Sequence, residues 1–219
     1  MPSLSPFALA VAALALCITL PVPGAAEVQV YDKKTNVARV LEYKLGPEQK
    51  RAWRDFSRSC CYFGAYAINT ERDLGFFVQG FNSRKMAISA AETGCAEFSR
   101  SEGANPKACR LYAFTVPTEV DVKDAAAAGL GVPAREGFIK LYQKNQSKTG
   151  YGAFAIASGR GWGASWDWPT RAEAKATAIA YCEADVAQTM AEIGPKAKDW
   201  VGKTGAGKCR VVHETAPQQ

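Results

Sequence analysis

FGAYAI at residues 63–68 returns as YGAFAI at residues 151–156, 88 positions further along the chain. Outward from this pair, further residues match at an offset of 88 or 87: Arg72 with Arg160, Gly75 with Gly163, Ala87 with Ala174, Ala91 with Ala178, and Cys95 with Cys182. After an insertion in the second copy, Cys109 matches Cys209. An internal repeat of this kind predicts that the chain contains two copies of one structural unit.

Each copy is expected to run helix, strand, strand, helix, strand. The strands are predicted from aromatic and β-branched content, and the second helix of each copy from a capping residue, Ser83 or Thr170, ahead of apolar residues at helical spacing. Three strands with one face under a helix form a small stable module. The predicted fold class is therefore α+β, with two pseudo-repeated modules that each pack a helix on a three-stranded antiparallel sheet.

The repeat also sets the expected boundaries along the chain. They are a signal peptide at 1–26, an N-terminal extended segment or hairpin at 27–44, the first repeat at 45–117, a connector at 118–131, the second repeat at 132–215 and a tail at 216–219.

The N-terminus has the layout of a secretory signal. An uncharged apolar run from Phe7 to Leu20 precedes Pro21–Ala26, where small residues suit a signal peptidase. We therefore expect the mature chain to be periplasmic or secreted. The run is shorter than the roughly 20 residues that cross a bilayer, so no permanent membrane span is expected.

The formal net charge of +6 lies entirely after residue 26. Lys and Arg are scattered through the chain, which is typical of a soluble surface and does not indicate a nucleic-acid site. A protein or an anionic envelope polymer is the expected partner, and the oligomeric state is not predicted.

Six cysteines follow the signal segment: Cys60, Cys61, Cys95, Cys109, Cys182 and Cys209. An even number in an oxidising compartment predicts disulfides. The cysteines common to both copies lie on the capped helix and the closing strand, which favours Cys95–Cys109 and Cys182–Cys209. Cys60 and Cys61 have no counterpart, and three fates stay open for them: a vicinal bond, a bond elsewhere or to another chain, or exposed thiols with redox reactivity.

Trp162, Ala164, Trp166 and Trp168 alternate along one predicted strand and are expected to share a face. Such a face is either sheet core or a stacking platform for sugars. Small Ala174 on the following helix suits packing against large rings and favours the core. Trp162, Trp166 and Trp168 are candidate ligand-binding residues if the opposite face of the strand meets the helix.

Residues suited to catalysis are sparse. His213 is the only histidine, and Asp167 and Glu173 are close in sequence but on different predicted elements. An envelope hydrolase would use these residues in a cleft between the copies. Residues 202–209, GKTGAGKC, nearly match the pattern of a phosphate-binding loop. Cys209 replaces the Ser or Thr of that pattern, and a helix is expected before the segment and a strand after it, which is the reverse of the required order. No catalytic residue, metal site or cofactor is therefore predicted.

These motifs resemble an exported bacterial family catalogued as domain of unknown function 4189, in two tandem copies. The resemblance is carried by YGAFAI, by WDWPTRAEA at residues 166–174, by Cys182 and by CRVV at 209–212. It is best over Tyr151–His213 and looser over Phe63–Thr115, where Phe77–Asn82 lacks the tryptophans and the proline. It implies an exported α+β module and transfers no active-site residue.

The duplicated scaffold and the lack of a polar constellation favour a non-enzymatic interaction or binding module of unknown ligand. Two alternatives remain open at this stage. One is an envelope hydrolase with a carboxylate or histidine site between the repeats, and the other is a thiol-redox protein that uses Cys60 and Cys61.

Overall fold

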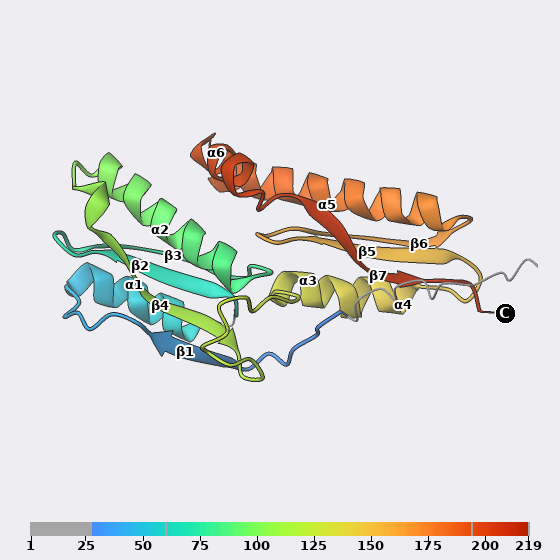
Figure 1. The fold of residues 1–219 in the computed structure, drawn as a ribbon, viewed down its shortest axis with the longest axis horizontal. Helices are drawn as coiled ribbons and strands as arrows, with labels where there is room; N and C mark the ends of the chain where they lie inside the picture. The colour runs from blue at the N-terminus through green and yellow to red at the C-terminus, as the bar shows by residue number, and fades with distance from the viewer. Residues whose placement is uncertain (1–27, 60, 194, 219) are drawn as a thin grey trace, which may run out of the picture.

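The computed structural model describes residues 28–59, 61–193 and 195–218, so the expected signal peptide lies outside the described residues (Figure 1). The elements in chain order are β1 (Thr35–Arg39), α1 (Pro47–Arg58), β2 (Gly64–Asn69), β3 (Leu74–Val78), α2 (Arg84–Ser101), η1 (Pro106–Ala108), β4 (Cys109–Pro117), α3 (Val132–Gly137), η2 (Phe138–Tyr142), α4 (Gln143–Asn145), β5 (Tyr151–Ala157), β6 (Trp162–Trp168), α5 (Arg171–Ile193), α6 (Pro195–Thr204) and β7 (Cys209–Thr215). None of the helices within these ranges combines the length and the apolar composition of a bilayer-spanning segment.

The strands form two antiparallel sheets, and the mixed α+β class is confirmed. The first sheet has the order β1-β4-β2-β3 and belongs to unit 1, residues 35–117. The second has the order β6-β5-β7 and belongs to unit 2, residues 132–215. In each unit the closing strand, β4 or β7, carries one extra residue opposite the central strand, Tyr112 in β4 and Val212 in β7.

The expectation of three strands was wrong for the first sheet, which has four. Thr35–Arg39 pairs antiparallel with Ala113–Pro117 and forms β1 at the edge of the sheet. The segment at 27–44 thus contributes a single strand, not a hairpin. An edge strand needs little apolar content, and β1 has exposed residues at Asn36, Val37 and Arg39, so its local pattern gives a weak signal.

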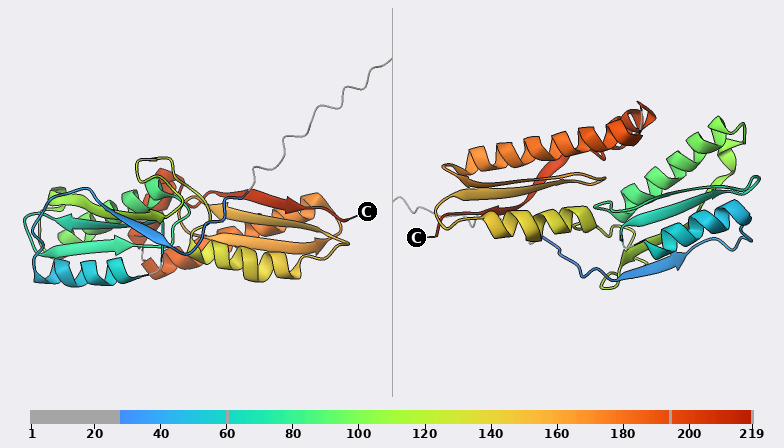
Figure 2. Two further views of the ribbon diagram at one scale, coloured as in Figure 1. Left: turned by 90° about the horizontal axis from the view of Figure 1, so that it is seen from below. Right: turned by 180° about the vertical axis from the view of Figure 1, so that it is seen from behind.

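Each sheet is covered by helices on both faces, whereas the sequence suggested one covering helix. In unit 1, α2 covers one face and α1 covers the other; in unit 2, α5 lies opposite the α3–η2–α4 helix (Figure 2). The second helical layers bury large aromatic rings against the sheets, Phe56 from α1 and Phe138 from η2. Each unit is therefore a three-layer sandwich with two separate apolar cores.

Two disulfides join cysteines that the structure describes. Cys95 in α2 bonds Cys109 at the start of β4, and Cys182 in α5 bonds Cys209 at the start of β7, with Cα–Cα distances of 6.0 and 6.1 Å. Each bond ties the long helix of a unit to its last strand. Cys60 lies outside the described residues, so the alternatives for Cys60 and Cys61 stay open.

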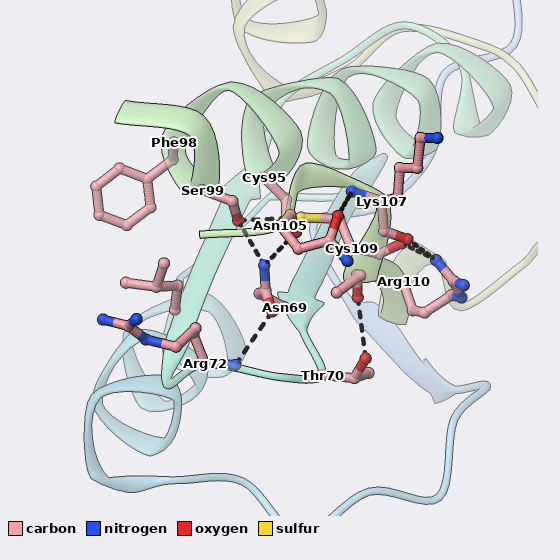
Figure 3. The surroundings of a disulfide bond; sticks show 12 residues. Asn69, Thr70, Arg72, Cys95, Phe98, Ser99, Asn105, Lys107, Cys109 and Arg110 are labelled. Carbon is pink, nitrogen blue, oxygen red and sulfur yellow. Dashed lines mark hydrogen bonds between the residues drawn. A yellow bond between two sulfur atoms is a disulfide. The ribbon is translucent and has the colours of Figure 1, made fainter. Parts of the chain in front are cut away.

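The two disulfides have different surroundings. Next to Cys109, the fully buried Asn69 donates from Nδ2 to Ser99 Oγ at 2.9 Å, and Ser99 Oγ lies 3.4 Å from Cys109 Sγ (Figure 3). In unit 2 the residue paired with Cys209 is Ala157, and the residue one helical turn after Cys182 is Val186. The first disulfide thus lies beside a buried polar cluster and the second beside apolar side chains.

Replacing both cysteines of one disulfide by serine is expected to lower the free energy of unfolding. The bonds close loops of 14 and 27 residues. The chain-entropy model gives about 3 kcal/mol for the shorter loop and about 3.5 kcal/mol for the longer one. Urea unfolding of the two double variants measures this difference. Unchanged stability in either variant would contradict a structural role for that bond.

Candidate functional site

Asn82 joins the two units. It lies between β3 and α2 and is 2% exposed. Its Nδ2 donates to the carbonyl oxygens of Ala157 at 2.8 Å and Gly161 at 3.1 Å, which lie in the β5–β6 hairpin of unit 2. Its backbone N donates to Gly159 O at 2.8 Å, and its Oδ1 accepts from Gly131 N at 2.8 Å. Both amide hydrogens of the Asn82 side chain are therefore donated to unit 2, and its oxygen accepts from the connector, so its hydrogen-bonding groups all have partners.

Trp200 makes a second contact between the units. This α6 residue donates from its indole Nε1 to Ser89 Oγ of α2 at 3.0 Å. Its ring meets Phe81 edge to face, with the ring centroids 6.2 Å apart. Polar and aromatic contacts thus hold α6 of unit 2 against unit 1.

A cavity of about 90 Å³ opens to solvent at this junction. It is lined by Gly80, Asn82, Pro133, Ala134, Arg160, Gly161, Trp162, Asp185 and Thr189. Residues from both units contribute, so the complete cavity depends on the docked arrangement that Asn82 stabilises.

Opposite charges reach this cavity from different elements. Arg160 comes from the β5–β6 turn, while Asp185 and Thr189 come from α5, and all three are half-buried. Asp185 Oδ2 accepts a hydrogen bond from Trp162 N at 3.1 Å, which fixes that carboxylate. Within the described part of the chain, the Arg160 guanidinium makes no hydrogen bond or ion pair. Arg160 thus brings a positive charge to the residues that line the cavity.

Gly161 is required for the shape of this wall. Its φ is +120°, a backbone conformation that L side chains rarely adopt. A Cβ at this position would lie 2.5 Å from Val186 Cγ2 on α5. Glycine therefore allows the hairpin to turn beside α5 and to present its carbonyl oxygen to Asn82.

The expectation that the tryptophans share one face was wrong. Trp162 packs with the core under α3 and η2, whereas Trp168 packs with the core under α5. Between them, the β5–β6 register shifts, and Asp167 has a φ of +59°. This bulge adds one residue to β6, and one extra residue reverses the face on which later side chains lie.

The three candidate tryptophans consequently have separate environments. Trp162 stacks on Phe154, with the ring centroids 5.7 Å apart, and also lines the junction cavity. Trp166 is 37% exposed, and neither it nor Trp168 lines that cavity. Of the three, Trp162 alone is therefore placed beside the cavity.

The residues considered for hydrolysis do not converge at the junction. Asp167 accepts from Ser147 N, and Glu173 accepts from Thr170 Oγ1 at the start of α5. Both lie toward the end of β6 that pairs with Tyr151, away from the cavity. His213 lies on β7, against the opposite face of the sheet from α5. In the residues that the structure describes, no group of three His, Cys, Asp or Glu side chains could hold a metal ion.

His213 belongs to an aromatic cluster. Its Nδ1 lies 3.1 Å from the hydroxyl of the buried Tyr142, which donates to Thr215 Oγ1 at 3.2 Å. Burial lowers the pKa of His213 below its ordinary value, and nearby Glu214 partly opposes this shift. Burial raises the pKa of Tyr142. Both groups are therefore neutral at pH 7, and their hydrogen bond packs η2 onto β7.

Sequence reasoning missed most of the cavity residues. Arg160 drew notice solely as the repeat of Arg72, and Asn82, Asp185 and Thr189 gave no motif. Asn82 reaches groups 75 and 79 positions away. Such long-range contacts have no local spacing signal, so a single sequence gives no means of finding them.

Comparison with known proteins finds relatives that are similar over a short segment. Protein Rv1269c of Mycobacterium tuberculosis and Protein Mb1300c of Mycobacterium bovis are each 56% identical to this chain over 32 residues, which is 15% of this chain. The match spans 26% of the length of each relative, and their names describe no activity. No family model and no solved structure matches the chain.

Asn82→Ala is expected to destabilise the docked arrangement by about 2–3 kcal/mol, because several buried backbone groups lose their partner. Urea unfolding measures the loss, and small-angle X-ray scattering reports whether the units separate. Asn36→Ala is a matched control, since Asn36 is exposed on β1. Equal stability and equal scattering for the two variants would contradict the role of Asn82.

The free energy of unfolding is expected to fall as pH drops from about 8 to about 6. The folded pKa of His213 lies below its ordinary value of 6.5, so the unfolded chain binds this proton more tightly. Urea unfolding across this pH range measures the slope. Because His213 is the only histidine, His213→Gln should flatten the profile. An unchanged slope in that variant would show that another group is responsible.

Proposed function

We propose that this chain is an exported, non-enzymatic binding protein whose ligand occupies the cavity between its two units. The observation that carries the proposal is that Arg160 lines a cavity built from both units, while its guanidinium makes no bond to described residues. Ligand sites commonly lie where structural units meet. A ligand with an anionic group is the expected occupant, since guanidinium pairs strongly with carboxylate or phosphate.

Export to the periplasm or outside the cell is part of the proposal. Two disulfides support it, because such bonds persist in oxidising compartments. The signal-like composition of residues 1–26 supports it independently. The surplus of positive charge suits a surrounding of anionic envelope polymers.

We further propose that the two units arose by duplication and are related to the family named domain of unknown function 4189. Apart from β1 in unit 1 and α6 in unit 2, both units run helix, strand, strand, helix, strand, and both join the long helix to the last strand by a disulfide. The matched segments at 63–68 and 151–156 form the central strands β2 and β5. Shared order, shared bonds and shared central strands support a common origin.

The hydrolase alternative has less support, because its candidate residues lie apart and outside the cavity. Asp167→Asn, Glu173→Gln and His213→Gln should leave ligand binding intact. The redox alternative depends on Cys60 and Cys61 and is tested by mass spectrometry without reductant. An exchangeable thiol pair at these positions would favour that alternative over simple binding.

Thermal-shift measurements with pools of small envelope solutes test the proposed function. A ligand should raise the melting temperature of the full mature chain by several degrees and be recovered chemically unchanged. Arg160→Gln should abolish the shift, while Arg54→Gln, on the exposed face of α1, should retain it. Conversion of the ligand, or a shift that is the same in Arg160→Gln, would contradict the proposal.

A further inference from the structure

The cavity carries one group of each charge sign. Arg160 supplies a cation, and Asp185 supplies a carboxylate on the neighbouring helix. No ion pair joins these two side chains in the structure as described, although both line the same small space. A bare anion would be attracted by Arg160 and repelled by Asp185. A ligand with both charges would satisfy the two side chains together.

The hydrogen-bonding groups of the lining residues that have no partner in the protein also suit a ligand with both charges. Asp185 Oδ2 already accepts from Trp162 N, which leaves Oδ1 to accept from an ammonium group. Asn82 has used both amide hydrogens and is a positioning residue. The Thr189 hydroxyl makes no hydrogen bond to other described residues and adds a neutral donor. The cavity thus offers a donor for a carboxylate and an acceptor for an ammonium.

The size of the cavity limits the ligand. A cavity of roughly 150 Å³ accommodates benzene, which has six non-hydrogen atoms. By that scale, about 90 Å³ accommodates about four non-hydrogen atoms, and the opening to solvent leaves room for slightly more. The nitrogen, α-carbon and carboxylate shared by all α-amino acids exceed this limit by one atom, so one atom and a methyl side chain would lie at the opening to solvent. A sugar ring with its hydroxyl groups is much larger.

We infer that the junction cavity binds a small free α-amino acid, of the size of glycine or alanine, with its carboxylate at Arg160 and its ammonium at Asp185. This inference rests on the proposed function, because it names the ligand class of the same cavity. Binding would contact unit 2 directly and would depend on Asn82 through the shape of the cavity. The ligand therefore favours the docked arrangement of the units.

Isothermal titration calorimetry of the full mature chain tests the inference with glycine, L-alanine and D-alanine. Acetate and methylammonium serve as probes with one charge, and phenylalanine as a probe that is too large. Glycine or alanine should bind at least tenfold more tightly than any of these three. Equal affinity for acetate would overturn the inference, because it would mean that an anion alone suffices.

Two variants separate the roles of the charges. Arg160→Gln and Asp185→Asn should each weaken binding at least tenfold, and asparagine keeps an oxygen that can accept from Trp162 N. Arg54→Gln and Asp55→Asn, both exposed on α1, are matched controls that should bind normally. Circular dichroism checks that each variant is folded. Normal binding by a folded Asp185→Asn variant would overturn the inference.

Failure of the inference is distinguishable from failure of the proposed function. If no amino acid binds but another small solute gives a shift that Arg160→Gln abolishes, the amino-acid assignment is wrong and the cavity is still a binding site. If no solute binds the folded wild-type chain in either experiment, both are wrong.

Discussion

The hydrogen bonds of Asn82 are the constraint on which the arrangement of the whole molecule depends. Each unit has its own sheet and its own disulfide, and the apolar contact between the units includes Trp200 of α6 packed on Phe81. Between the units, one buried amide bonds to the β5–β6 hairpin and to the connector. An amide buried without partners is unfavourable, so Asn82 favours one docked arrangement over all others. The hydrogen bonds of this buried amide therefore specify how the two units are docked.

The cavity follows from this docking. Gly80 and Asn82 reach it from unit 1, and Arg160 and Asp185 reach it from unit 2. A cavity shared in this way couples its occupant to the position of the units, because separation of the units removes part of its wall. The polar character of the junction suits it both for docking the units and for binding a ligand. The region that holds the units together also contributes charged residues to the cavity wall. An apolar interface could hold the units together but would offer no charged groups to a ligand.

Features with local signals could be predicted from the sequence, and features set by distant contacts could not. The central strands, the capping residues Ser83 and Thr170 and the paired cysteines have short, repeated patterns. The faces of β6 could not be predicted, because the bulge at Asp167 depends on pairing with β5 and reverses the alternation of the tryptophans. The candidate site could not be predicted at all from local patterns. Asn82 donates to a carbonyl group 75 positions along the chain, and no periodic pattern in the sequence indicates such a contact.

The two closing strands have different outer edges, and this difference affects self-association. In unit 1, β1 covers β4, whereas among the described residues no strand pairs with the outer edge of β7. An uncovered edge is a template on which identical chains polymerise into fibrils. The extra residue at Val212 interrupts the regular run of β7, so that only short stretches remain on either side. An irregular edge of this kind is a poorer template for a second chain than a long regular strand.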